Sequence, residues 1–348
     1  MRDRIWAEID LAALRFNASA VKKRLGGSKL MAVIKADAYG HGAARAAQSL
    51  EGIADFLAVA CISEAMELRG AGIKAPLLIL GYTPPECAEL LLGNGLTQTV
   101  FDVEYARELS DRAGSRRIDA HLKIDTGMNR LGVRTAEEGR EILALPGLDI
   151  TGVFTHLASS DNAADTVAQL AKFDQIRKFL GNITITHCAN SGAVLYCRES
   201  WYDVARTGLL IFGTGAGDEL KPVMTLKACV AQVKTVAAGE RISYSGTYTA
   251  RGGMKVATIC AGYADGYSRA LSNRGEAFVL GKRVPVVGRV CMDMLMLDVS
   301  AAGDVKRGDE ATLFGNGGAS AEEVALKAGT IPYEIFCSVS KRVPRIYI

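Results

Sequence analysis

Short apolar runs alternate with longer amphipathic segments through the first two thirds of the chain. The runs that predict strands are Leu30–Ile34, Phe56–Ala60, Leu77–Leu80, Leu96–Val100, Ala120–Ile124, Gly152–Thr155 and Ile183–Thr186. Helix-forming segments rich in Ala, Leu, Glu, Lys and Arg lie between them, at 42–50, 62–71, 103–113, 136–144 and 166–179. This alternation predicts βαβ units and a parallel sheet. A weaker strand at Tyr202–Ala205 brings the count to eight, which favours a (β/α)8 TIM barrel over an open doubly wound sheet.

The pattern changes after Pro222, where short strands are separated by Gly-rich turns. The predicted strands are Thr225–Val236, Lys255–Ala261, Ala277–Leu280, Val284–Val287, Met294–Val299 and Glu310–Phe314, with one helix at Ala321–Ala328. We therefore expect an α/β barrel over residues 11–222 and a C-terminal mainly-β domain over residues 223–348. The alternating segment Arg4–Ile9 predicts that residues 1–10 add a strand to this second domain.

Composition narrows the class of protein and its surroundings. The 348 residues are 49% hydrophobic with a net charge of +3, which predicts a large packed core and argues against nucleic acid or membrane as a partner. The N-terminus lacks the apolar region of a signal peptide, and no uncharged apolar run reaches the ~20 residues of a membrane span. The eight cysteines are scattered singly without a CxxC pair, so we expect reduced thiols and a cytoplasmic location.

Lys35 is the first candidate for chemistry, at the end of the first predicted barrel strand in AVIKADAYGHGA. Reactive groups of such barrels gather at the C-terminal ends of the strands. Partial burial there would lower the pKa of the amine and make it a nucleophile or a base, but taken alone the lysine is interpreted more readily as a solvated loop residue. His41, His121 and His187 lack metal-ligand spacing, so we predict no metal site and interpret them as structural.

Ordered motifs along the whole chain resemble those of one known family. They are WAEIDLAAL, AVIKADAYGHGA, HLKIDTGMNRLGV, FTHLASSD, HCANSGA, ARTGLLIFG, ISYSGTYTA, GYADGYSR, VGRVCMDM and KRVPRIYI. Through them the chain resembles the alanine racemases, isomerases that use pyridoxal 5'-phosphate and join a barrel to a β-domain. The resemblance implies interconversion of L-alanine and D-alanine (EC 5.1.1.1), which supplies D-alanine for peptidoglycan. It also implies a cytoplasmic homodimer whose active sites are shared between subunits.

The resemblance assigns roles to individual residues. Lys35 would hold the cofactor covalently and act as the base for the D-enantiomer, while Tyr244 would be the base for the L-enantiomer. The implied cofactor contacts are Tyr39, His156, Asn190, Ser191, Arg206, Gly208, Leu209 and Lys341. Barrel geometry independently places a phosphate site in the loops after the last two strands. In the family the arginine matched by Arg206 faces the pyridine nitrogen and disfavours its protonation, which implies selective racemisation with little transamination.

Other residues are matched to the substrate. Arg130, Met292 and Asp293 resemble residues near the substrate carboxylate, the latter two from the partner subunit, and Tyr263 resembles a tyrosine at the site entrance. Lys123 matches a position that is a carbamylated lysine in some members.

One difference from the family leaves the identity of the substrate open. Lys341 stands where better known members have a tyrosine next to the phosphate and the entrance. A broader racemase of serine or other amino acids therefore remains an alternative. A non-catalytic pyridoxal-phosphate-binding protein is an alternative from another class, but related proteins of that kind lack the β-domain and its tyrosine.

Overall fold

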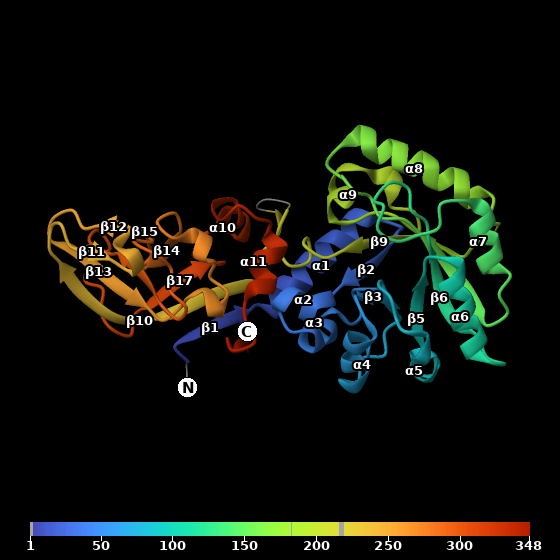
Figure 1. Cartoon of the computed structure of the whole chain (residues 1–348), viewed down its shortest axis with the longest axis horizontal. Helices are drawn as coiled ribbons and strands as arrows, with labels where there is room; N and C mark the ends of the chain where they lie inside the picture. Colours follow the sequence, from blue (N-terminus) through green and yellow to red (C-terminus); the bar gives the residue numbers. More distant parts are fainter. Residues whose placement is uncertain (1–2, 182, 216–218) are drawn as a thin grey trace.

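The computed structural model describes residues 3–181, 183–215 and 219–348 and has two parts, which lie one beside the other along the long axis of the molecule (Figure 1). One part is a nearly closed barrel of parallel strands surrounded by helices, and the other is mainly β-sheet. The predicted fold class is therefore confirmed. Across the described ranges, no helix has both the length and the apolar character needed to span a membrane.

The barrel contains eight parallel strands in the order β8-β7-β6-β5-β4-β3-β2-β9. They are β2 (Lys29–Val33), β3 (Phe56–Val59), β4 (Leu77–Ile79), β5 (Leu96–Val100), β6 (Ile118–Lys123), β7 (Leu148–Phe154), β8 (Ile185–His187) and β9 (Val204–Thr207). The two ends of this sheet meet at Asp203. Its backbone N–H donates to the carbonyl of Thr186 at 3.1 Å, and its carboxylate accepts from the Thr186 N–H at 2.8 Å. One aspartate thus joins β8 to β9.

Helices cover the outside of the barrel. They are α1 (Leu11–Leu25), α2 (Lys35–Gly40), α3 (Ala43–Leu50), α4 (Ile62–Gly70), α5 (Ala88–Gly93), α6 (Val103–Ala113), α7 (Ala136–Leu143), α8 (Ala163–Lys178) and α9 (Ser191–Tyr196). Side-chain caps fix where several of them begin: the carboxylates of Asp10 and Asp102 accept backbone N–H groups, and Thr135 forms a capping box with Glu138. Strand periodicity did not reveal α1 or the short helices α2, α5 and α9.

The second part is built around the 13-residue strand β10 (Met224–Val236). Its sheet also contains β1 (Ile5–Ile9), β13 (Met254–Ile259), β14 (Glu276–Val279), β15 (Lys282–Pro285), β16 (Leu295–Asp298), β17 (Glu310–Phe314) and β18 (Arg345–Tyr347). A separate hairpin pairs β11 (Arg241–Ile242) with β12 (Tyr248–Thr249). The helices are α10 (Ala321–Ala328) and α11 (Pro332–Ser338), with one-turn helices η4 (Tyr244–Gly246) and η5 (Tyr263–Asp265).

The C-terminus lies close to where the two parts meet (Figure 1). Strand β1 pairs antiparallel with β10 and parallel with the last strand, β18. From β18, the Nε of Arg345 donates to the carbonyl of Gly40 at 2.9 Å, while its other nitrogens donate to three carbonyls of the segment 339–343. A Cβ at Gly42 would lie 1.9 Å from the hydroxyl of Tyr347. The C-terminus therefore packs directly against the loop that carries Lys35.

Candidate active site

Lys35 lies at the C-terminal end of β2, where the barrel strands end and their loops begin. Burial lowers the pKa of its amine, and the positive charge of Arg130 lowers it further. Glu64 and Cys337 oppose this shift. The structure therefore favours a reactive amine over a fully solvated loop lysine at this position.

The four residues after Lys35 form a left-handed turn. Ala36, Asp37, Ala38 and Tyr39 have φ angles between 52° and 54°. This conformation costs roughly 1–2 kcal/mol for each residue that carries a Cβ. Strain of this size persists only where the surroundings enforce it, and it concentrates at functional sites.

Three side chains hold the backbone of this turn in place through hydrogen bonds. The carboxylate of Asp37 accepts the N–H of Ala43 at 2.7 Å. The buried ring of His41 donates from Nδ1 to the carbonyls of Ala38 and Tyr39, at 2.9 and 3.1 Å. Together with the bond from Arg345 to the carbonyl of Gly40, these contacts hold the loop in a single shape.

The turn directs Tyr39 toward the loops after β8 and β9. A Cβ at Gly208 would lie 2.6 Å from the Tyr39 hydroxyl, so only glycine leaves room for this approach. The N–H of Gly208 donates to Ser191 Oγ at 3.2 Å, and Asn190 caps α9 through the N–H of Ala193. Burial raises the pKa of Tyr39, which keeps its hydroxyl protonated. Hydroxyls and backbone N–H groups thus converge here, with Leu209 next in the chain, and this neutral donor set suits a phosphate monoester.

Arg206 is buried at the end of β9 and makes five polar contacts. Its nitrogens donate to the carbonyls of Thr155, His187 and Cys188 at 2.8 to 3.0 Å. They also donate to the Nδ1 atoms of His187 at 2.7 Å and His156 at 3.3 Å. Burial lowers the pKa of Arg206 to about 10, so the guanidinium stays charged at neutral pH. Within the described residues it has no carboxylate partner.

His187 and His121 extend this network, which the sequence did not predict. Because an arginine only donates, the Nδ1 of His187 must accept, so its proton lies on Nε2. That Nε2 donates to the Nδ1 of His121 at 2.8 Å. Burial lowers the pKa of His121 to about 4 and, together with Arg206, lowers that of His156 to about 3. Only the positions of both histidines within barrel strands could have indicated this arrangement.

Lys123 and Arg130 complete the polar side of the barrel mouth. Lys123 is 3% exposed, and its Nζ donates to the carbonyl of Leu131 at 2.9 Å. Burial, with the charges of Arg206 and Arg130, lowers the pKa of Lys123 to about 8. Arg130 itself is exposed in the loop that follows β6. The barrel mouth therefore gathers Lys35, Lys123, Arg130 and Arg206.

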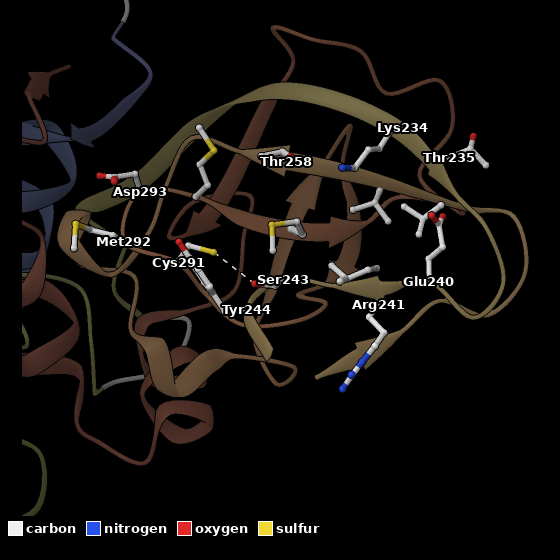
Figure 2. Close-up of a pocket in the computed structure, with 15 residues that line it drawn as sticks. Lys234, Thr235, Glu240, Arg241, Ser243, Tyr244, Thr258, Cys291, Met292 and Asp293 are labelled. Carbon is white, nitrogen blue, oxygen red and sulfur yellow. Dashed lines mark hydrogen bonds between the residues drawn. The ribbon is translucent and has the colours of Figure 1, made fainter. Parts of the chain in front are cut away.

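The other predicted residues lie on the surface of the β-domain. Tyr244, Met292 and Asp293 line a groove of about 720 Å³ together with Cys291, Met294 and Met296 (Figure 2). Tyr244 is 69% exposed and Met292 is 53% exposed. Tyr263, 42% exposed, lies beside them, since its N–H donates to the carbonyl of Cys291.

Local backbone geometry projects Tyr244 outward. Its neighbours Ser243 and Ser245 have φ angles of 66° and 61°. The hydroxyl of Ser243 donates to the carbonyl of Arg289 at 2.6 Å and lies 3.5 Å from Cys291 Sγ (Figure 2). Tyr244 is therefore presented to solvent by a fixed turn.

The structure does not bring all the predicted residues into one site within a chain. Tyr244 lies between β11 and β12 in the β-domain, whereas Lys35 begins α2 beside the barrel (Figure 1). Lys341 is exposed in the segment after α11. The next residue, Arg342, donates to Asp293 and to the buried Asp265, both at 2.7 Å.

A barrel with a partly buried lysine at the end of a strand, joined to a β-domain with an exposed tyrosine, defines the class of this protein. The alanine racemase N-terminal domain family matches residues 9–215, and the alanine racemase C-terminal domain family matches residues 223–347. The chain belongs to the alanine racemase family.

Individual relatives agree over the full length. The chain is 43% identical to alanine racemase of Desulforamulus reducens, covering 100% of both chains. It is 44% identical to that of Clostridium perfringens, covering 99% of this chain and 95% of the relative. Among solved structures, alanine racemase of Clostridium difficile 630 has a TM-score of 0.94 at 38% identity, covering 100% of this chain and 96% of that one. The Bacillus anthracis enzyme with bound L-Ala-P has a TM-score of 0.92 at 36% identity, with the same coverage.

Proposed function

We propose that this protein is an amino-acid racemase, EC 5.1.1.1, that interconverts L-alanine and D-alanine with pyridoxal 5'-phosphate bound at the barrel mouth. One observation carries the proposal: an amine of lowered pKa, a cradle of hydroxyl and N–H donors and a buried guanidinium open onto the same barrel mouth. Membership of the family supports the reaction. The C. perfringens and B. anthracis relatives carry the same name, and the latter was solved with L-Ala-P.

The donor chemistry of the barrel mouth fits this cofactor. Lys35 would hold it covalently, and Tyr39, Asn190, Ser191, Gly208 and Leu209 would bind its phosphate. Arg206 and His156 would lie against its ring, and Lys341 would add a second cation near the phosphate. When bound, the cofactor withdraws electrons from the substrate Cα and makes the α-proton acidic. Arg206, held by carbonyls and imidazoles, would disfavour a proton on the ring nitrogen of the cofactor and so restrict side reactions.

Racemisation requires proton transfer on both faces of the substrate. In the proposed scheme the Lys35 amine exchanges the α-proton of D-alanine, and the Tyr244 hydroxyl exchanges that of L-alanine from the opposite face. Because Lys35 lies beside the barrel and Tyr244 lies in the β-domain, the proposal takes Tyr244 from a second copy of the chain. We therefore propose a homodimer with shared sites, to which Tyr263, Met292 and Asp293 also contribute. Their exposure in the single chain supports this assembly.

Arg130 is proposed to bind the substrate carboxylate, with a carbamylated Lys123 as its anionic neighbour. At neutral pH an amine with a pKa of about 8 has an appreciable neutral fraction, and only the neutral amine attacks CO2. The amine nitrogen forms a new bond to carbon while one C=O π bond of CO2 breaks, and one proton is released, so the neutral amine becomes an anionic carbamate facing Arg130.

Two further parts of the proposal concern the cell. The proposed location is the cytoplasm, supported by eight cysteines that are all free. The proposed product, D-alanine, would supply peptidoglycan.

A racemisation assay with separate alanine, serine and lysine substrates tests this function. Purified protein with pyridoxal phosphate should be yellow and convert L-alanine and D-alanine into each other, with serine turned over roughly a hundredfold less well. A Lys35→Ala variant should lose both colour and activity, whereas Lys172→Ala on α8 should keep both. Equal turnover of serine would identify a broader racemase, and colour without turnover of any amino acid would identify a binding protein.

A further inference from the structure

Glu64, in the first turn of α4, connects two barrel strands at the point where Lys35 stands. Its Oε1 accepts the N–H of Ala36 at 2.7 Å, and its Oε2 accepts the N–H of Ala60 at 2.7 Å. Ala36 directly follows Lys35 after β2, and Ala60 directly follows β3. One carboxylate therefore fastens the residue after Lys35 to the end of the neighbouring strand.

From this geometry we infer that Glu64 is a positioning residue for Lys35, which fixes the peptide after the lysine and places a negative charge beside its amine. The inference rests on the proposed function, because it concerns the same lysine. It adds a residue that none of the sequence motifs indicated.

The strained backbone of the turn explains why Ala36 needs this hydrogen bond from its N–H to Glu64. Ala36 is the first residue in the left-handed conformation and is exposed, so packing of its methyl group contributes little to holding it there. A carboxylate that accepts its N–H supplies a charge-assisted hydrogen bond at the strained position. In an ordinary helix cap, one carboxylate oxygen of Glu64 would accept an N–H at the start of α4. Here the other oxygen also accepts an N–H, that of Ala36, which lies 28 residues earlier in the sequence.

Charge gives Glu64 a second effect on Lys35. The groups that face the Lys35 amine from neighbouring elements are Glu64 on α4, Cys337 on α11, Arg130 after β6 and His156 after β7. Glu64 is the carboxylate among these four, and its charge raises the pKa of Lys35 against the effects of burial and Arg130. Because both of its oxygens are bound to backbone N–H groups, the charge cannot swing away to solvent.

Glu64→Gln tests the inference, because it keeps the length of the side chain but removes the charge and one acceptor. The full-length chain, without added cofactor, is acylated at a series of pH values, and the rate at Lys35 is followed by mass spectrometry of its peptide. The midpoint of the pH profile should fall by roughly one unit or more in Glu64→Gln. Glu67→Gln, on an exposed position of the same helix, should leave it unchanged. An unchanged midpoint in Glu64→Gln would overturn the inference.

Glu64→Asp covers the case in which Glu64→Gln does not fold. The shorter carboxylate keeps its charge but cannot span both N–H groups, so we expect a midpoint between those of the wild type and Glu64→Gln. A midpoint identical to that of the wild type would again contradict the inference.

Cofactor uptake separates this result from the proposed function. If Glu64→Gln shifts the acylation profile but neither protein takes up pyridoxal phosphate at Lys35, the proposed function fails and Glu64 keeps its positioning role. If both take up the cofactor with the same pH profile, the function stands and the positioning role fails.

Discussion

The barrel mouth and the groove of the β-domain differ in how far their side chains are already ordered. At the barrel mouth, Arg206 is 4% exposed and its guanidinium makes five polar contacts, while Lys123 is 3% exposed. In the groove, Tyr244 and Met292 are 69% and 53% exposed. One half of the proposed site is thus built within the chain, and the other is displayed on its surface.

This difference follows from the cost of burying charge. The cations of the barrel mouth must be held by carbonyls, imidazoles and backbone geometry, because a buried charge without partners is strongly destabilising. The groove carries Tyr244 and methionines beside charged residues such as Arg241 and Asp293, and these exposed side chains can stay hydrated in the monomer and become buried on association. A single chain can therefore order the half of the proposed site that holds buried cations and leave exposed the half that is proposed to meet a partner.

The largest expected effect tests whether the two halves come from different chains. Lys35→Ala should abolish activity, and Tyr244→Phe should slow conversion of L-alanine about 10²–10⁴-fold because the second base is lost. Mixed in equal amounts and allowed to exchange subunits, the two inactive proteins should regain roughly a quarter of wild-type activity through dimers with one intact site. A racemisation assay of the mixture measures this recovery.

A matched tyrosine serves as the control for that mixture. Tyr82→Phe changes an exposed tyrosine of the barrel and should stay fully active alone. If labelled subunits exchange but no activity returns, both halves of the site belong to one chain. The proposal that the groove serves the barrel mouth of a second chain is then wrong.

A smaller effect concerns the charge of Lys123 at the barrel mouth. Its neutral fraction rises as the pH rises through its pKa of about 8, so carbamate formation at fixed dissolved CO2 should increase between pH 7 and pH 9. Carbon-13 NMR of protein in labelled bicarbonate should show a carbamate signal that Lys123→Ala lacks and that Lys172→Ala retains. Removing CO2 should raise the KM for alanine roughly tenfold, because Arg130 loses an anionic neighbour. A signal that persists in Lys123→Ala would place the carbamate elsewhere.

The sequence predicted the barrel because each parallel strand is a short apolar run, and the structure places all eight close to the expected ranges. The pattern placed Lys35 at the end of such a run, but taken alone it favoured a solvated loop lysine, and only the resemblance to a known family assigned its role. The histidine pair was not found, because His121 and His187 lie 66 residues apart and meet only because β6 and β8 flank β7 in the folded sheet. Glu64 resembled any other acidic residue of a helical first turn. Its two backbone contacts depend on tertiary geometry that periodicity does not encode.

The smallest expected effect measures the strain stored in the ordered half. At Ala36, with a φ of 53°, glycine removes roughly 1–2 kcal/mol of left-handed strain but adds about 0.5–1 kcal/mol of chain entropy to the unfolded state. Ala36→Gly should therefore raise the free energy of unfolding by about 0.5–1 kcal/mol. In the right-handed helix α3, Ala44→Gly should lower it by a similar amount. Urea denaturation of both variants measures whether each substitution raises or lowers the free energy of unfolding. If Ala36→Gly lowers the free energy of unfolding as much as Ala44→Gly does, the turn stores no strain. Hydrogen bonds alone would then keep the barrel mouth ordered.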